Sequence, residues 1–270
     1  MVFQSLADAR DYVLSNDEDY FITDEIIRGV SFKVFKNGPK LIPDILNLCL
    51  NHKEKDFLVF DKERYSFGEF HQLTCQIAHL LMDEYSIRPG DRVAILMKNS
   101  PEFPLIFMAL SSIGAVAVCL NSWWTSDELK YGFMDSKVKL VFTDEQRLAK
   151  IKGFVSEMGV QTVLCRHQNS DKSDEFWNSL LTSTNNELPR TTIDQDSDFA
   201  VMYTSGSTGH PKGVVMTHRG AISTLMSWHF GLRVLDVMGL GPVPYVDKNN
   251  QPYQPCQLVS VPSVSYTHLT

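Results

Sequence analysis

The sequence predicts an α/β fold in which helices flank layered parallel sheets, and two observations support this. From about residue 56 onward, short apolar runs that suit buried strands alternate with longer segments of helical periodicity. Parallel strands need crossover connections, and the alternating helices supply them. The chain has 270 residues, 43% of them hydrophobic and 21% charged, which suits a globular protein with a sizeable core.

The first elements of this alternation are a short strand and an amphipathic helix. Residues 57–60 form the expected strand. Ser66 and Glu69 then have the spacing of a capping box, which marks a helix start. A turn at 88–91 leads to the next strand, at 92–97. One apolar stripe on the helix is expected to face the core: Phe67, Phe70, Leu73, Ile77, Leu80 and Leu81.

The following elements have similar start signals. Ser100 and Pro101 open a helix, with proline in the first turn. Thr125 and Glu128 form a second capping box, and Asp144 caps a further helix. The helices that start at Thr125 and Asp144 are expected to reach about Asp135 and Met158, and strands are expected at 115–120, 139–142 and 160–164.

Residues 103–120 contain no charge, and this length just reaches that of a membrane-spanning helix. Pro104, Ser111, Ser112 and Gly114 interrupt the run, so we expect a buried helix, a turn and a buried strand instead. Residues 1–10 lack the apolar core of a signal peptide. These features predict a cytoplasmic protein without a membrane span, with peripheral membrane or organellar association left open.

Charge and cysteine content argue against nucleic-acid binding, a zinc site and a disulfide framework. The formal net charge is -7 and no basic stripe is present, so nucleic-acid binding is not expected. No two cysteines have CxxC spacing, so neither a zinc site nor a disulfide framework is indicated. The cysteines are Cys49, Cys75, Cys119, Cys165 and Cys256.

Residues 166–198 are polar and predict a surface connection with one short helix at 177–181. A strand at 199–203 follows, then a segment rich in glycine and hydroxyl side chains, then a strand at 214–216 and a helix from Arg219. The tight spacing between two apolar runs argues against a flexible linker.

The segment 203–213 has the composition of a polyphosphate-binding loop. Its glycines permit positive φ angles and close backbone approach, and successive N–H groups can form an anion-binding nest. Lys212 adds a positive charge, and Pro211 stiffens the approach to it. The glycines are Gly206, Gly209 and Gly213, and the hydroxyl donors are Thr204, Ser205, Ser207 and Thr208.

Two common nucleotide-binding motifs do not fit this segment. In a Walker-type loop the lysine follows glycine and precedes Ser or Thr, but here Pro211 precedes Lys212 and Gly213 follows it. A strand-like run rather than a helix comes next. No G-x-G-x-x-G is present, so the dinucleotide-binding fingerprint is also excluded.

The run 203–213 resembles the signature loop of the adenylate-forming (AMP-binding) superfamily, which includes acyl-CoA synthetases, luciferases and peptide-synthetase adenylation domains. The resemblance extends over about 41–262 and is closest to acyl-CoA synthetases. Weaker matches occur in the family's order at 88–94, 99–102, 114–116, Asn121, 128–129 and 135–136.

This resemblance implies a fold, a reaction and a set of ligands. The fold is the front part of the family's large N-terminal domain. The reaction converts a carboxylic acid, here expected to be a fatty acid, to an acyl-adenylate and then to acyl-CoA. ATP, Mg²⁺ and coenzyme A are the expected cofactors, a small-molecule acid is the expected partner, and no metal ligand is identified. The residues implied to hold the ATP phosphates are Thr204, Ser205, Gly206, Ser207, Thr208, Gly209 and Lys212.

The same resemblance gives the expected domain boundaries. Residues 1–40 are an N-terminal extension and 41–262 a partial AMP-binding domain, while 263–270 resemble a translated sequencing adapter and are expected to be non-native. The catalytic residues are expected beyond 262, so the chain is expected to be truncated and inactive alone. Loading of a carrier protein, a non-catalytic nucleotide-binding module and luciferase-like oxygenation remain alternatives.

Other polar or aromatic residues are weaker candidates, each with a structural alternative. His218 and His229 could face a ligand, although core or packing roles are commoner. Trp123 and Trp124 could line a pocket or simply pack. Asp194, Asp196 and Asp198 alternate and could suggest a metal, although a solvated strand entrance is the simpler interpretation.

Overall fold

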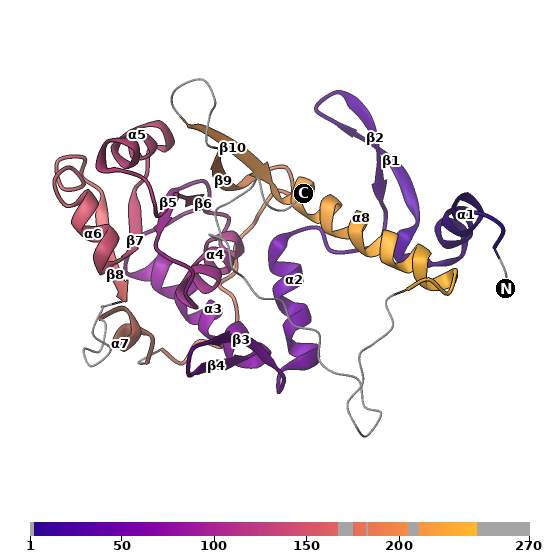
Figure 1. Cartoon of the computed structure of the whole chain (residues 1–270), viewed down its shortest axis with the longest axis horizontal. Helices are drawn as coiled ribbons and strands as arrows, with labels where there is room; N and C mark the ends of the chain where they lie inside the picture. The colour runs from indigo at the N-terminus through magenta and orange to yellow at the C-terminus, as the bar shows by residue number, and fades with distance from the viewer. Residues whose placement is uncertain (1–2, 167–174, 182, 205–210, 242–270) are drawn as a thin grey trace. The chain divides into compact units, whose positions relative to one another are not determined.

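The computed structural model describes residues 3–166, 175–181, 183–204 and 211–241. Within them, a six-stranded sheet has the order β10-β9-β6-β5-β7-β8 (Figure 1). Strands β5 to β9 pair in parallel, and β10 pairs antiparallel with β9. The strands are β5 Arg92–Leu96, β6 Val116–Cys119, β7 Leu140–Asp144, β8 Gln161–Arg166, β9 Asp198–Thr204 and β10 Lys212–Thr217. The predicted α/β fold is confirmed, with one antiparallel edge strand.

Helices cover both faces of this sheet. Alternate residues of β5 point to opposite faces, so Val93 and Ile95 pack with α3, α4 and α7, while Ala94 and Leu96 pack with α5. Both faces are therefore buried, which explains the continuous apolar runs of the strands. The helices are α3 Phe67–Asp83, α4 Glu102–Ser112, α5 Ser126–Ser136, α6 Glu145–Ile151 and α7 Glu175–Leu181, preceded by α2 Ile42–Leu48 and the 3₁₀ turn Cys49–His52.

The helix starts predicted from the sequence are confirmed. Ser66 and Thr125 each accept a hydrogen bond from the backbone of a glutamate three residues on, and each glutamate side chain accepts one in return. Asp144 accepts from the backbone N–H of Arg147 and caps α6. The uncharged run at 103–120 is a helix, a turn at Gly114 with φ 74°, and a strand. None of the helices in the described part of the chain is long and apolar enough to cross a membrane.

Two predicted elements differ from the structure. The strand β3 (Asp56–Phe60) lies outside the main sheet and pairs with β4 (Glu63–Ser66) in a hairpin that turns at Asp61, with φ 50°. The helix α6 ends at Ile151 rather than near Met158, because consecutive turns that include Gly153 follow it. Phe154 and Val155 still reach the core from these turns.

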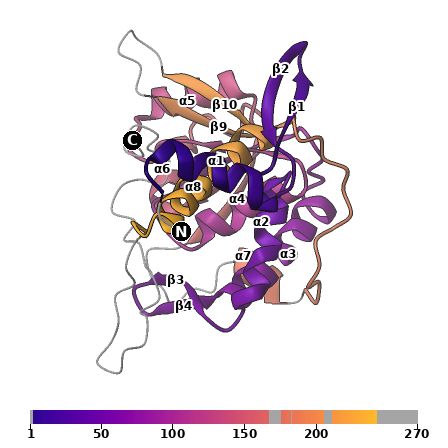
Figure 2. The same cartoon turned by 90° about the vertical axis from the view of Figure 1, so that its right-hand side faces the viewer.

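The chain divides into two compact units, and the sheet belongs to the one that contains residues 41–218. The other unit includes, among the described residues, 3–40 and 219–241. Its described elements are α1 Leu6–Asn16, the 3₁₀ turn Glu18–Tyr20, the hairpin of β1 Ile22–Ile27 and β2 Val30–Phe35, and most of α8, His218–Val237. Figures 1 and 2 show α1 beside α8, where Ala9 and Val13 pack with Val234.

Candidate functional site at the carboxyl edge of the sheet

Polar residues lie at the carboxyl end of every parallel strand in the sheet. Thr204 ends β9, the segment 121–124 follows β6, and the segment 98–102 follows β5. Asp144 ends β7 and Arg166 ends β8. Because carboxyl ends of parallel strands meet at one edge, these groups share the edge at which open α/β sheets bind ligands. This edge is the candidate functional site.

The β9–β10 hairpin brings Thr204 and Lys212 together at this edge. They form a directly opposed pair across the antiparallel ladder, and Thr204 Oγ1 donates a hydrogen bond to the Lys212 carbonyl oxygen at 3.4 Å. Lys212 is exposed, and no carboxylate of the described residues forms an ion pair with it. The remaining predicted phosphate-binding residues, Ser205 to Gly209, lie outside the described residues.

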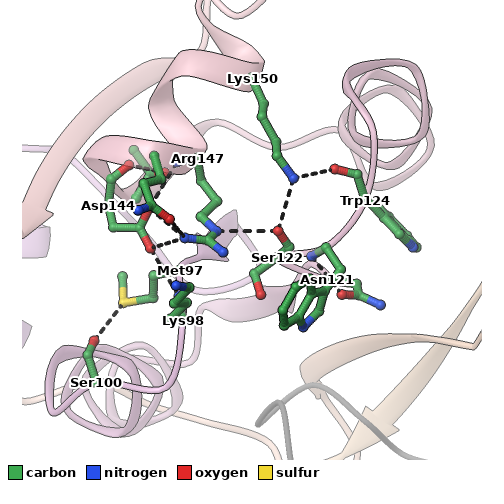
Figure 3. A network of polar contacts seen from close by, with 12 residues as sticks. Met97, Lys98, Ser100, Asn121, Ser122, Trp124, Asp144, Arg147 and Lys150 are labelled. Atoms are coloured by element: carbon green, nitrogen blue, oxygen red, sulfur yellow. Dashed lines mark hydrogen bonds and ion pairs between the residues drawn. The ribbon is translucent and has the colours of Figure 1, made fainter. Parts of the chain in front are cut away.

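A buried arginine and a lysine on α6 hold the segment that follows β6 (Figure 3). Arg147, 5% exposed, donates through Nε to the Ser122 carbonyl oxygen at 3.3 Å. Lys150 Nζ donates to the carbonyl oxygens of Ser122 at 3.2 Å and Trp124 at 2.8 Å. Three cationic hydrogen bonds to carbonyl oxygens therefore fix the backbone of 122–124 beside the end of β9.

Asp144 connects this network to the end of β5. Its carboxylate forms an ion pair with Arg147 at 3.3 Å and accepts from the Lys98 backbone N–H at 3.1 Å. One carboxylate thus links the chain after β5 and, through Arg147, the chain after β6. The sequence analysis identified Asp144 only as a helix cap and missed Arg147 and Lys150. Their signal was the placement of both cations within the two turns after that cap.

A second charged cluster lies at the end of β8. Arg166 binds Glu63 at 2.8 Å and Glu102 at 2.7 Å. The hydrogen bond from Arg166 is the main cause that lowers the pKa of Glu63. Glu102 is fully buried, and its Oε1 also accepts from Trp177 Nε1 at 3.1 Å. This cluster joins α4, α7 and the β3–β4 hairpin to the sheet.

His218, a weaker candidate, is a buried helix-start residue. It is the first residue of α8, and its Nδ1 accepts from the Ile42 backbone N–H at 3.3 Å. Burial lowers the pKa of its imidazole to about 4, so the ring is neutral at pH 7. Nδ1 accepts, so the proton is assigned to Nε2, which has no partner among the described residues. The core interpretation is therefore confirmed.

The other weak candidates are distributed over different parts of the molecule. Trp124 is buried, whereas Trp123 is 70% exposed at the carboxyl edge. His229 lies in the other unit, with its Nδ1 2.7 Å from the Tyr20 hydroxyl. Asp198 begins β9 and so lies at the opposite edge from Thr204. In the described part of the chain, no group of three or more potential ligands could hold a metal ion.

These features define an α/β protein with the fold of the N-terminal domain of adenylate-forming enzymes. The chain belongs to the AMP-binding enzyme family, whose model matches residues 48–246. It is 37% identical over 146 residues to 4-coumarate–CoA ligase CCL1 of Humulus lupulus, which covers 53% of this chain and 26% of that protein.

Solved structures give the same fold. The inhibitor-bound N-terminal domain of FACL13 from Mycobacterium tuberculosis superposes with a TM-score of 0.59 and 28% identity, covering 67% of this chain and 45% of that one. A Mycobacterium tuberculosis fatty acyl CoA synthetase gives a TM-score of 0.61 and 25% identity, covering 74% and 42%. The chain spans less than a third of the length of the curated relatives it matches.

Proposed function

We propose that this chain is part of an acid–thiol ligase that uses ATP to activate a carboxylic acid and passes the acyl group to coenzyme A. Membership of the AMP-binding enzyme family supports this reaction class. The observation that carries the proposal is the β9–β10 hairpin. It presents Thr204 and Lys212 at the edge that forms the candidate site, where the exposed Lys212 lies directly opposite Thr204 in the ladder.

The reaction has two balanced steps. A carboxylate oxygen of the acid attacks the α-phosphorus of ATP, the bond from this phosphorus to the β-phosphate oxygen breaks, and pyrophosphate leaves with its charge. The thiol sulfur then attacks the acyl carbon, the thiol loses its proton and AMP leaves. In the first step, negative charge grows on the β- and γ-phosphates, where a cation and hydrogen-bond donors are most useful.

The chemistry of the hairpin end suits these phosphates. Lys212 would act as a point charge on the departing pyrophosphate, and Thr204 would donate its hydroxyl. The Gly- and hydroxyl-rich residues 205–209 would supply backbone and side-chain donors. Mg²⁺ is expected with the nucleotide from the family resemblance, and it would neutralise part of the phosphate charge.

For the acid, a fatty acid is the first candidate, since the chain resembles fatty-acid–CoA ligases. A 4-coumarate-type aromatic acid is the second candidate, favoured by the names of its curated relatives. Loading of a carrier protein instead of coenzyme A is a further alternative for the second step. A non-catalytic nucleotide-binding module would retain nucleotide affinity and lack both steps.

The first test is Mg·ATP binding by titration calorimetry, comparing the parent chain with Lys212→Ala. Loss of one charge-assisted contact is expected to weaken binding by roughly 10- to 100-fold. Lys62→Ala is the matched control, because Lys62 is an exposed lysine in the β3–β4 turn. Equal affinities for the parent and Lys212→Ala would refute the phosphate-binding role.

The second test concerns the acid and the thiol. Pyrophosphate release is measured with ATP and a panel of fatty and hydroxycinnamic acids, with coenzyme A present or absent. Preference within the panel identifies the acid class. Nucleotide binding without pyrophosphate release for any acid, in the longest available form of the protein, would favour the non-catalytic module.

A further inference from the structure

The tyrosine that precedes Thr204 links the β9–β10 hairpin to a neighbouring helix. Tyr203 is 6% exposed, and its hydroxyl donates a hydrogen bond to Asp135 Oδ2 on α5 at 2.7 Å. The Gly132 carbonyl oxygen lies 3.4 Å from the same hydroxyl. Burial, followed by the hydrogen bond to Asp135, raises the pKa of Tyr203, so the hydroxyl keeps its proton and remains a donor.

The ring of Tyr203 also supports the opposite strand of the hairpin. Gly213 is its direct partner across the ladder, and a Cβ placed on Gly213 would lie 3.3 Å from Tyr203 Cζ. The aromatic ring therefore covers a glycine of the edge strand β10, an arrangement that stabilises such positions. Trp124 packs edge-on against the ring, with centroids 5.4 Å apart and planes at 70°.

The position of Tyr203 is important because, in the part of the chain that the structure describes, β10 pairs with β9 alone. Lys212 and Gly213 are both exposed, so contacts on the solvent side of β10 do not hold the end of the hairpin in place. Tyr203 is adjacent to Thr204, and Gly213 is adjacent to Lys212. A movement of the Tyr203 ring would therefore displace both predicted phosphate-binding residues together.

We propose that Asp135 and Tyr203 are positioning residues that hold Thr204 and Lys212 in register for the nucleotide phosphates, an inference that rests on the proposed function. Neither residue touches the phosphates. The Tyr203 hydroxyl fixes the ring on α5, and the ring fixes β10 through Gly213. Trp124 packs against another side of the Tyr203 ring, and Lys150 donates a hydrogen bond to the Trp124 carbonyl oxygen.

The chain contains a matched control for this interaction. The Tyr65 hydroxyl donates to Glu63 Oε2 at 2.8 Å, and burial is likewise the main cause that raises the pKa of Tyr65. This second tyrosine–carboxylate pair lies in β4, outside the main sheet. Tyr203→Phe and Tyr65→Phe therefore remove the same group from two places and leave both rings present.

The test measures two quantities in the parent and in each variant. Hydrogen–deuterium exchange of peptides covering β10 measures how often the hairpin opens in the absence of nucleotide. Titration calorimetry measures the affinity for Mg·ATP. For Tyr203→Phe we expect roughly fivefold to tenfold faster exchange in β10 and a similar loss of affinity. Tyr65→Phe should change neither the exchange rate nor the affinity. Asp135→Ala should change both in the same direction as Tyr203→Phe. Asp135→Asn keeps an oxygen that accepts the hydrogen bond, so both quantities should stay close to those of the parent.

The outcomes separate the two proposals. Unchanged β10 exchange and unchanged affinity in Tyr203→Phe, with a parent that binds Mg·ATP, would overturn the positioning role alone. Equal effects from Tyr65→Phe would also overturn it, because they would show a general loss of stability. A parent that does not bind Mg·ATP, in the longest available form of the protein, would overturn the proposed function, and the phosphate-positioning role with it.

Discussion

Replacing Gly213 by alanine tests whether the hairpin is as tightly packed as the structure indicates. The new Cβ would lie 3.0 Å from Val201 Cγ1 and 3.3 to 3.4 Å from the Tyr203 ring. Val201 is 4% exposed and Tyr203 6%, so neither neighbour can move freely. Overpacking of this kind costs about 1–3 kcal/mol.

An opposing effect acts in the unfolded chain. Gly213 does not have a positive φ, so alanine can adopt its backbone conformation. Alanine restricts the unfolded chain more than glycine does, which stabilises the fold by about 0.4–1 kcal/mol. The steric term is larger, and we expect a net loss of about 1–2 kcal/mol in the free energy of unfolding. Urea denaturation followed by tryptophan fluorescence measures it.

The control is Gly153→Ala, because a Cβ on Gly153 meets no atom within 4 Å. There the unfolded-state effect acts alone, and a gain of about 0.4–1 kcal/mol is expected. A double variant of Gly213→Ala with Val201→Ala removes the closest contact, so the two changes should couple favourably by about 1 kcal/mol. A stabilising Gly213→Ala, or strictly additive changes, would refute the packing argument.

Two further predictions concern buried charged groups. Glu102→Ala should lower the free energy of unfolding by about 2–3 kcal/mol in urea denaturation, because Arg166 and Trp177 lose a partner. As a control, Glu54→Gln at an exposed ion pair should change the free energy of unfolding by less than about 0.5 kcal/mol. Equal effects of the two substitutions would contradict the stabilising role of the buried Glu102. His218 has a folded-state pKa below its unfolded value, so its stabilising contribution is present above pH 6.5 and is lost as the pH falls towards about 4. The parent should lose up to about 1.4 kcal/mol per pH unit in that window relative to His218→Asn, whose amide oxygen can still accept from Ile42, and identical pH profiles would contradict this.

The elements that local chemistry determines were predictable from the sequence. Ser66, Thr125 and Asp144 mark helix starts because each side chain satisfies a backbone N–H within three residues. The parallel strands were recognisable because burial on both faces requires continuous apolar runs. Thr204 and Lys212 were recognisable as candidate phosphate-binding residues because glycines, hydroxyl groups and one lysine are concentrated in the short segment between two apolar runs.

Elements that depend on distant partners were not predictable. The strand β3 has an ordinary strand composition, but its pairing with β4 rather than with the main sheet depends on a turn at Asp61 that takes a positive φ. The antiparallel direction of β10 was not part of the predicted parallel sheets, because its apolar run by itself suits either direction. The spacing between the two strands was the missed signal, since a parallel strand requires a longer crossover connection.

The polar network of Figure 3 shows why most of the candidate site required the structure. Arg147 and Lys150 are separated by 25 and 26 residues from the carbonyl oxygens of Ser122 and Trp124 that they bind. The acceptors are backbone atoms, so the sequence at 122 and 124 carries no complementary charge. Trp124 also packs on Tyr203, which connects these cations to the base of the hairpin. The sequence motif therefore predicts which donors meet the nucleotide phosphates, whereas the residues that hold those donors in place are defined by strand order.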